Sequence, residues 1–463
     1  MKLSHMAFLL HARLIGEDRD ITRFSTDTRS LSGGELFIAL SGAHFNGNRF
    51  AADAAARGAI AVVVSEEQAG LSVPQLLVED THVALGKISH AWREQFDIVS
   101  VAITGSAGKT TTKEFAASIF AEMGPTLATL GNKNNDIGVP LTLFRLNDTH
   151  RYGVFELGAN HIGEIAYTSN LVSPQAAVIT NVGSAHLEGF GSREGIAQAK
   201  GEIYGGLVKG GIACINLDDE FAPYWKDLCK HRQQLHFSLQ QKADVWADNV
   251  RQADSGRYAF DLHIGARTAD IELQLIGRHN IANAVAAAAL AHACHVPLEK
   301  IVAGLSKTRP VPGRLNLHVM SSPAGTSCRL IDDTYNANPS SMKAAIDVLA
   351  EMPGRRVLVT GDMGELGRAT ESGHNEVGGY AKMKKIDALY SVGQYSHFTA
   401  AGFGPEARTF PDQQGLIEEL EKELETVVTL LVKGSRSAQM ENVVNAMLEK
   451  GRLENSRLDN KES

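Results

Sequence analysis

The 463-residue sequence has few cysteines, no long apolar run and no excess of basic residues. The apolar run at residues 1–10 is too short for a secretory signal, and no stretch approaches the ~20 apolar residues that cross a bilayer. The formal net charge of −8 argues against a nucleic-acid partner, which would require a basic face. No CxxC pair or disulfide-like spacing occurs among its cysteines, which are Cys214, Cys229, Cys294 and Cys328. We therefore expect a cytoplasmic protein without membrane insertion.

What the sequence does contain is enough apolar side chain for several buried cores. Hydrophobic residues make up 43% of the chain and charged residues 21%, which are values of globular proteins. A length of 463 residues corresponds to about three domains of ordinary size. Predicted strands and helices alternate along most of the chain, which indicates an α/β fold.

The chain divides into three predicted domains and a tail. Residues 1–82 carry short β-type runs around a helix and indicate a small α/β domain. Residues 83–310 indicate a central P-loop ATPase-like domain with a mostly parallel sheet, although residues 244–276 alternate like hairpins. Residues 311–450 have the strand and helix alternation of a Rossmann-like domain. The charged residues 451–463 indicate a flexible tail.

A glycine-rich turn lies between a predicted strand and a predicted helix of the central domain. Backbone N–H groups of such a turn surround phosphate oxygens, Lys109 would reach the β- and γ-phosphates, and the Thr110 hydroxyl would face Mg²⁺. The common pattern has a glycine five positions before Gly108, where this chain has Ile103, so a tight turn with an exposed lysine is the alternative. The shortened form resembles the phosphate loop of Mur ligases and folylpolyglutamate synthases and predicts ATP binding by Gly105, Ser106, Ala107, Gly108, Lys109, Thr110 and Thr111.

Three polar residues downstream could support the activation of a carboxylate by ATP. Glu156 ends a predicted strand at 152–156, where the edge of a parallel sheet is well placed for a cation. His186 lies in the loop after the next strand, and Lys200 in a helical stretch at 193–204. Taken alone, each has an ordinary structural or solvated alternative. Their order and spacing resemble the Mur ligase family, which implies that Glu156 and His186 bind Mg²⁺ and that a carbamylated Lys200 supports a second Mg²⁺.

Further positions resemble the nucleotide-binding residues of the same family. The resemblance implies that Asn280 or Asn283 faces the adenine, with a helix-capping asparagine as the alternative. It implies that Arg314 reaches the ATP phosphates and that Asp332 or Asp333 binds a ribose hydroxyl.

The run Asp332-Asp333-Thr334-Tyr335-Asn336-Ala337-Asn338-Pro339 indicates a branch of the family. It resembles the members that add D-alanyl-D-alanine, whereas members that add other amino acids have histidine-bearing versions. A structural turn is the alternative for the Asn-Pro step. Substrate-binding residues implied by the resemblance are Tyr335, Asn336 and Asn338 here, Asn132, Asn134 and Asn135 in a nucleotide-sugar loop, Lys433, Ser435 and Arg436 for a peptide carboxylate, and Ser25, Asp27 and Arg29 for uridine diphosphate.

The resemblance covers essentially the whole chain and implies one reaction. ATP would phosphorylate the terminal carboxylate of UDP-MurNAc-tripeptide, and the amine of D-Ala-D-Ala would displace phosphate to form the amide. The third domain would close over ATP, and we expect a monomer. Another Mur-type or folylpolyglutamate-type amide ligase and a non-catalytic ATP-binding switch stay as alternatives. The sequence does not distinguish a tripeptide ending in meso-diaminopimelate from one ending in L-lysine.

Overall fold

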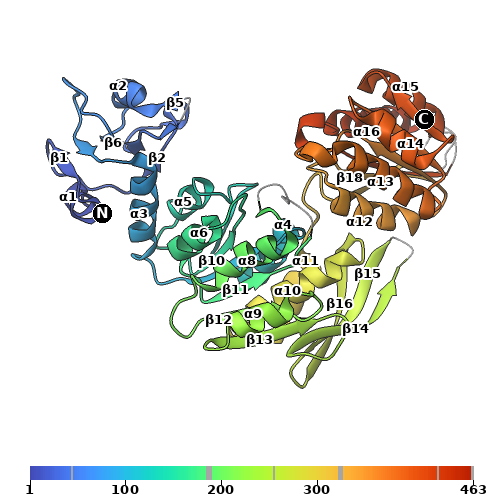
Figure 1. Ribbon diagram of the computed structural model, residues 1–463, viewed down its shortest axis with the longest axis horizontal. Coiled ribbons are helices and arrows are strands. Elements are labelled where there is room, and N and C mark those ends of the chain that lie inside the picture. Colours follow the sequence, from blue (N-terminus) through green and yellow to red (C-terminus); the bar gives the residue numbers. More distant parts are fainter. Residues whose placement is uncertain (43–44, 184–189, 254–255, 322–326, 425–426, 460–463) are drawn as a thin grey trace.

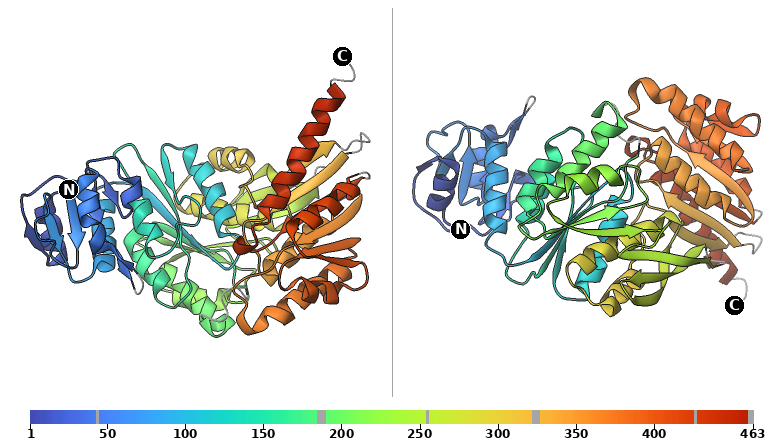
Figure 2. Two further views of the ribbon diagram at one scale, coloured as in Figure 1. Left: turned by 90° about the horizontal axis from the view of Figure 1, so that it is seen from above. Right: turned by 60° about the horizontal axis from the view of Figure 1, so that its bottom comes forward.

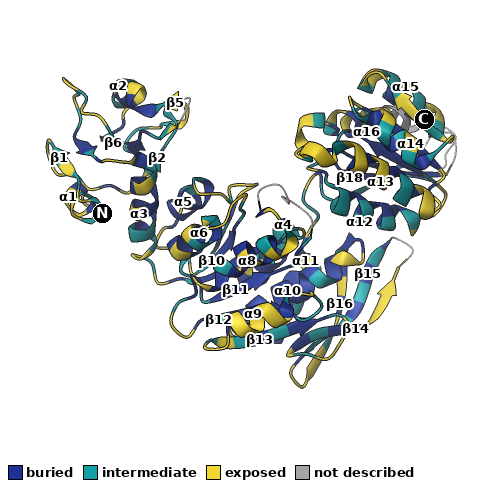
Figure 3. Ribbon diagram, viewed as in Figure 1, coloured by how far each residue is buried: buried dark blue, intermediate teal, exposed yellow. Residues whose placement is uncertain are grey.

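The computed structural model describes the whole chain except residues 43–44, 184–189, 254–255, 322–326, 425–426 and 460–463. Three units follow one another in space as they do in the sequence, and each is built on its own sheet (Figures 1 and 2). The inner strands of each sheet are buried, whereas exposed residues lie on the outer surfaces of the helices, in loops and along outer strands such as β1, β14 and β16 (Figure 3). Among the described residues, no helix is both long and apolar enough to span a bilayer.

The first unit has a five-stranded sheet in the order β1-β7-β6-β3-β2, parallel except at the β1–β7 pair. Strand β6 is Ala-Val-Val-Val, and its side chains alternate between two apolar clusters on opposite faces of the sheet. The strands are β1 (Arg13–Ile15), β2 (Phe24–Ser25), β3 (Leu36–Ile38), β6 (Ala61–Val64) and β7 (Gln75–Leu77), beside the short pair β4 (Ser41–Gly42) and β5 (Phe45–Asn46). The helices are α1 (Leu3–Leu10), η1 (Thr28–Ser30), η2 (Gly47–Phe50), α2 (Ala51–Ala56) and α3 (Thr81–Arg93).

The second unit has a nine-stranded sheet in the order β16-β15-β14-β13-β12-β11-β8-β10-β9. The strands from β9 to β14 in that order are parallel, and the insert predicted to form hairpins is the antiparallel β14–β16 extension. The strands are β8 (Val99–Thr104), β9 (Thr126–Ala128), β10 (Tyr152–Glu156), β11 (Ala176–Ile179), β12 (Ile212–Asn216), β13 (Gln233–Ser238), β14 (Val245–Gln252), β15 (Arg257–Ile264) and β16 (Arg267–Ile276). The helices are α4 (Lys109–Ala121), α5 (Gly138–Leu143), α6 (Glu164–Val172), α8 (Arg193–Gly201), η3 (Glu202–Tyr204), α9 (Ala222–Leu228), α10 (His279–Ala293) and α11 (Leu298–Lys307).

The third unit has a six-stranded sheet in the order β17-β18-β22-β19-β20-β21, parallel except for the β17–β18 pair. Apolar clusters cover both faces of this sheet, as expected for a Rossmann-like unit. The strands are β17 (Asn316–Ser321), β18 (Ser327–Asp333), β19 (Arg355–Thr360), β20 (Ala388–Val392), β21 (Ala407–Phe410) and β22 (Val428–Lys433). The helices are α12 (Pro339–Ala350), η4 (Gly367–Ala369), α13 (Thr370–Met383), α14 (Ser396–Phe403), α15 (Gln413–Glu423), η5 (Arg436–Ala438) and α16 (Glu441–Asp459).

The predicted segment limits do not all coincide with breaks between elements. The limit after residue 82 falls inside α3, and α16 continues to Asp459 through most of the predicted tail. The limit after residue 310 falls in the connection between α11 and β17. The segment limits themselves stay a prediction.

The first unit is joined to the second by a shared apolar core. Trp92 on α3 donates from Nε1 to the Leu146 carbonyl at 3.2 Å, and Phe24 stacks on Phe144 with ring centroids 4.0 Å apart. One apolar cluster includes residues from Leu3 in the first unit to Cys229 in the second. Separating these two units would therefore expose a large apolar surface.

The third unit contacts the second over a smaller set of groups. Tyr258 on β15 donates its hydroxyl to Glu351, which follows α12. Ile276, the last residue of β16, packs into a core cluster of the third unit. This difference makes the third unit the one that can change its position with less loss of buried apolar surface.

Candidate active site

The phosphate loop joins β8 to α4 as predicted, and two of its glycines are required by close neighbours. Gly108 has φ +78° and caps α4, and a Cβ atom there would clash with the Asn283 amide oxygen. A Cβ atom at Gly105 would clash with the Thr180 hydroxyl. The segment after β11 fixes the loop further, because the Ala107 N–H donates to Asn181 Oδ1 at 3.0 Å. The loop thus holds a set conformation at the carboxyl edge of the sheet.

Lys109 begins α4 and lines a pocket of about 510 Å³ between the second and third units. Its ammonium donates to the Gly105 carbonyl at 2.7 Å. Burial lowers the pKa of Lys109, and the nearby Arg314 lowers it further, whereas Glu156 acts in the opposite direction. Lys109 and Arg314 form no ion pair with a carboxylate among the described residues, and two such cationic side chains favour an anionic ligand in this part of the pocket.

Glu156 ends β10 and is only 2% exposed. Its carboxylate accepts hydrogen bonds from the Thr110 hydroxyl and from Asn134 Nδ2, both at 2.9 Å. Carboxylate and hydroxyl oxygens are ligands that Mg²⁺ prefers, and a buried carboxylate is stabilised by a cation. The structure therefore brings two of the predicted metal ligands into contact.

Of the other two predicted metal ligands, only Lys200 lies among the described residues. His186 lies outside the described residues, among which there is no cluster of three or more His, Cys, Asp and Glu side chains with metal-binding geometry. Lys200 on α8 is 3% exposed and lines the same pocket as Glu156. Its ammonium has no hydrogen-bond or ion-pair partner among the described residues, and burial, followed by the charge of Lys109, holds its pKa well below the usual value. A lysine in this environment is not an ordinary solvated helix residue.

The two asparagines predicted to face the adenine line the pocket but already have partners. Asn280 donates from Nδ2 to the Ile276 carbonyl at 2.7 Å, which ties the start of α10 to the end of β16. Asn283 donates to Asn280 Oδ1 at 2.9 Å. Both amides therefore support the local fold in this arrangement, but neither is the capping asparagine of the alternative, because the N-cap of α10 is Arg278.

Arg314 reaches the pocket from the connection before β17. Its guanidinium lies over the Tyr335 ring, 4.2 Å from the centroid, and its Nε is buried without a hydrogen-bond partner among the described residues. Asp332 and Asp333 at the end of β18 accept from the N–H groups of Gly313 and Leu315 at 3.0 and 3.2 Å. The two aspartates thus position the backbone on both sides of Arg314, and the hydrogen-bonding capacity of its buried Nε is unused by the described residues.

Residues of the run 332–339 and of the last strand, β22, meet at the pocket. Lys433 forms an ion pair with Asp333 at 2.6 Å and donates to the Asn336 carbonyl at 2.8 Å. Asn338 is the N-cap of α12 and forms a capping box with Ser341. Polar residues of this run and of the predicted nucleotide-sugar loop line the pocket, namely Tyr335, Asn336, Asn338, Asn132, Asn134 and Asn135.

Of the predicted residues that the structure describes, seven do not line this pocket, and Gly105 and Asp332 are two of them. The other five lie after β22 or in the first unit. Ser435 and Arg436 follow β22, where Arg436 pairs with Glu441 at 2.9 Å, and Ser435 makes no side-chain cap to the short helix η5. Ser25, Asp27 and Arg29 lie in the first unit.

Asp27 and Arg29 form a turn at η1 in the first unit. Both nitrogens Nε and Nη2 of Arg29 donate to the Asp27 carboxylate, which also caps η1. The hydrogen bonds from Arg29 lower the pKa of Asp27 to about 2. The guanidinium stays largely exposed, so it is accessible to a ligand in the first unit.

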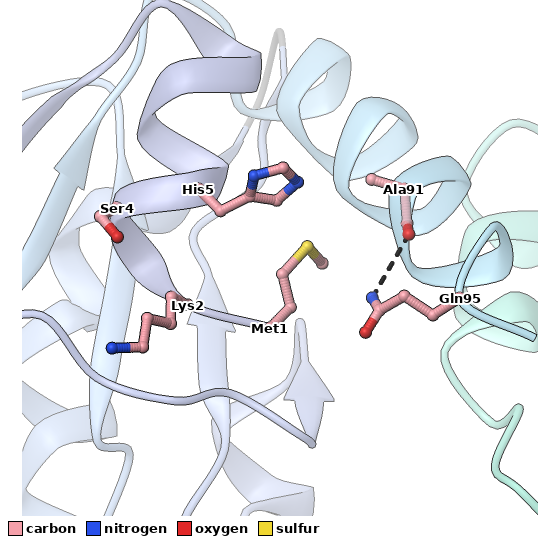
Figure 4. A pocket seen from close by; sticks show the side chains of 6 residues that line it. All are labelled: Met1, Lys2, Ser4, His5, Ala91 and Gln95. Atoms are coloured by element: carbon pink, nitrogen blue, oxygen red, sulfur yellow. Dashed lines mark hydrogen bonds between the residues drawn. The ribbon is translucent and has the colours of Figure 1, made fainter.

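A second hollow lies between α1 and α3, but its lining offers no converging polar groups (Figure 4). The hydrogen bond drawn there is local, because Gln95 donates to the carbonyl of Ala91, four residues earlier in the chain. This hollow carries no feature of a reaction site.

Several pocket residues were missed by the sequence analysis. Asn160 and Glu164 follow β10, Asn181 follows β11, and Glu365 follows β19. Their common signal is a polar residue shortly after a predicted parallel strand, at the edge where ligands of such sheets bind.

Comparison with known proteins matches the chain to three Mur ligase domains. The Mur ligase family catalytic domain matches residues 20–93, the Mur ligase middle domain residues 103–291, and the Mur ligase glutamate ligase domain residues 313–436. The UDP-N-acetylmuramoyl-tripeptide--D-alanyl-D-alanine ligase of Escherichia coli strain K12 is 46% identical over 454 residues, which cover 97% of this chain and 98% of that protein. The chain belongs to the Mur ligase family.

Solved structures of other Mur ligases have a similar fold over nearly the whole chain. A crystal structure of MurF from Acinetobacter baumannii aligns with a TM-score of 0.89 at 36% identity and covers 96% of this chain and 98% of that chain. The MurF ligase of Thermotoga maritima, solved in complex with ADP, aligns with a TM-score of 0.82 at 25% identity and covers 93% and 98%. These likenesses confirm the predicted three-domain α/β fold.

Proposed function

We propose that this Mur ligase joins D-Ala-D-Ala to UDP-MurNAc-tripeptide at the expense of ATP. The observation that carries the proposal is the pocket that combines the phosphate loop, Glu156 and Lys200 of the second unit with Arg314 and the Tyr335–Asn338 run of the third. Full-length relatives with this activity in their names support the choice of substrates. They favour it over another amide ligase and over a non-catalytic switch.

The cationic side chains of the pocket fit phosphoryl transfer to a carboxylate. A carboxylate oxygen attacks the γ-phosphorus, the bond to the β-phosphate oxygen breaks, and ADP leaves. Lys109 and Arg314 would bind phosphate oxygens and offset the repulsion between the two anions. The amine of D-Ala-D-Ala then attacks the acyl carbon, phosphate leaves with one carboxylate oxygen, and the amine gives up a proton.

The contact between Thr110 and Glu156 fits a Mg²⁺ site. The Thr110 hydroxyl would bind the cation instead of donating to Glu156, whose buried carboxylate would then have a positive partner. A bound Mg²⁺ supplies positive charge to the phosphate oxygens. The backbone N–H of Glu156 donates to Thr129 Oγ1 at 3.0 Å, which fixes the end of the strand for this purpose.

Lys200 fits the proposed carbamylation. Its lowered pKa favours the unprotonated amine, which can add CO₂: an N–C bond forms, one C=O bond opens, and a proton leaves. The product is an anion with oxygen ligands, of the kind that suits a second Mg²⁺ in a pocket otherwise rich in cations. A carbamate would also end the unfavourable burial of an unpaired ammonium. The predicted participation of His186 belongs to the same proposal.

The contacts between units support closure of the third unit over the nucleotide. The first two units share one core and can hold the nucleotide sugar, with Arg29 accessible, while the third unit contributes Arg314 from a smaller interface. Closure would keep water away from the acyl phosphate. A monomer and a cytoplasmic location remain predictions.

Phosphate release measured with each substrate omitted in turn tests this function. We expect full release only with ATP, UDP-MurNAc-tripeptide and D-Ala-D-Ala together, with tripeptides ending in meso-diaminopimelate and in L-lysine compared side by side. A switch would bind ATP without depending on D-Ala-D-Ala. A different amide ligase would require another acid, and either result would overturn the proposal.

A further inference from the structure

Four acidic side chains line the pocket, and they differ in their partners. Glu156 accepts from Thr110 and Asn134, and Asp333 pairs with Lys433. Glu164 accepts from the Asn160 N–H at 2.8 Å, and only the fourth, Glu365, has no hydrogen bond or ion pair within the described part of the chain. Glu365 is solvent-exposed and is thus the one pocket carboxylate without a hydrogen-bond or ion-pair partner among the described residues.

The loop after β19 presents Glu365 in a strained backbone conformation. Its φ is +60°, a left-handed value that is uncommon for residues other than glycine, asparagine and aspartate. The residues just before Glu365 are held in place, since Asp362 accepts from the N–H groups of Gln394 and Tyr395 at 2.8 and 3.0 Å. The Met363 N–H donates to the buried His374 at 3.0 Å. Such support around an unfavourable φ indicates that the position of this side chain matters.

The same loop lies beside the segment that follows β22. The Ser435 N–H donates to the Asp362 carbonyl at 2.9 Å. A Cβ atom built on Gly364 would lie 3.6 Å from the Ser435 Cβ atom and 3.9 Å from the Ser437 hydroxyl. Glu365 is therefore next in sequence to a residue that touches the segment predicted to bind a peptide carboxylate.

We propose that Glu365 binds the ammonium group of the incoming dipeptide. This inference rests on the proposed function and names a residue that selects the acceptor. A dipeptide at neutral pH carries a carboxylate and an ammonium group, and its two ends need opposite charges.

The other charges of the pocket explain why such a residue is needed. Lys109 and Arg314 both line it and would attract the nucleotide and the acyl phosphate. The same cations repel a dipeptide ammonium, and a free carboxylate on the third unit offsets that repulsion where the acceptor arrives. Glu365 thus orients the amine toward the acyl carbon, and the ammonium gives its proton to water before attack.

A pair of ligands that differ in one group tests the proposal. D-Ala-D-Ala and propionyl-D-alanine, which lacks only the amino group, are measured on wild type and on Glu365→Gln with UDP-MurNAc-tripeptide and ATP present. We expect the KM for D-Ala-D-Ala to rise about tenfold or more in the variant. The inhibition constant of propionyl-D-alanine and the KM values for ATP and the nucleotide tripeptide should stay unchanged.

Two further variants separate binding from folding. Glu371→Gln alters an exposed glutamate of α13 outside the pocket and should behave as wild type. Glu365→Gly relieves the left-handed strain, so its Tm should equal or exceed that of wild type while its KM for D-Ala-D-Ala rises as in Glu365→Gln. An unchanged KM in a wild-type background that does use D-Ala-D-Ala would overturn the role of Glu365 alone. A wild-type enzyme that does not use D-Ala-D-Ala would instead overturn the proposed function.

Discussion

Replacing Lys200 by methionine should stabilise the fold and abolish the reaction. The side chain is 3% exposed, and no described group pairs with its ammonium. An unpaired buried polar group costs about 1–3 kcal/mol, and methionine has a similar length without the charge. We therefore expect the free energy of unfolding to rise by about 1–3 kcal/mol, which corresponds to a Tm increase of roughly 2–12 °C for a domain of this size.

The stability that Lys200→Met gains over wild type should decrease as the pH rises. The pKa of Lys200 in the folded protein lies well below its ordinary value of 10.5, so the ammonium is the disfavoured form in the folded state. The destabilisation is complete below the folded pKa and disappears as the pH rises toward 10.5. The difference in Tm between Lys200→Met and wild type should accordingly be largest at the low end of that range and shrink as the pH increases.

The assay is thermal unfolding in buffer free of bicarbonate and Mg²⁺, followed by phosphate release in complete medium. Lys209→Met, at an exposed lysine, is the matched control and should leave Tm and turnover unchanged. With bicarbonate and Mg²⁺ present, wild type should regain stability relative to Lys200→Met, whose turnover should be at least ~100-fold lower. A variant that is less stable in the depleted buffer, or that keeps wild-type turnover, would refute the reasoning.

Three further predictions concern the phosphate loop, the first unit and the interface between units. Gly108→Ala combines a left-handed φ with a clash against Asn283, so calorimetry should show ATP affinity at least tenfold lower, and wild-type affinity would contradict the loop assignment. Arg29→Ala should weaken nucleotide-sugar binding with ATP affinity and Tm unchanged, because its guanidinium is exposed; equal sugar affinity in equilibrium binding would place that ligand elsewhere. Tyr258→Phe removes the hydrogen bond to Glu351, and spin-label distances between the second and third units should broaden; an unchanged distribution would mean that this contact does not hold the third unit.

Local patterns in the sequence were sufficient to predict the phosphate loop and the position of Glu156 at the end of β10. The strand predicted at 152–156 is β10 itself, and the glycines of the loop have the conformations that a phosphate loop requires. Both features depend on residues adjacent in the chain, so propensity and spacing are informative. The contact between Thr110 and Glu156 also follows, because the carboxyl ends of neighbouring parallel strands meet at one edge.

Features that depend on distant packing could not be predicted in this way. Glu365 was not singled out, because its place in the pocket depends on how β20 and β22 position the loop after β19. The hydrogen-bond partner of Asn280 could not be predicted either, because the sequence does not show that its amide donates to the Ile276 carbonyl. Nor does the pattern around Lys200 show that this helix lysine is buried and has no ion-pair partner among the residues that the structure describes.

The path of one oxygen atom tests the central claim most directly. UDP-MurNAc-tripeptide labelled with ¹⁸O in its terminal carboxylate is turned over with ATP and D-Ala-D-Ala, and the phosphate released is analysed by mass spectrometry. If the carboxylate attacks the γ-phosphorus and phosphate then leaves the acyl carbon, each phosphate formed with the amide carries one ¹⁸O from the tripeptide. Amide formation that releases phosphate without the label would contradict an acyl phosphate as the intermediate.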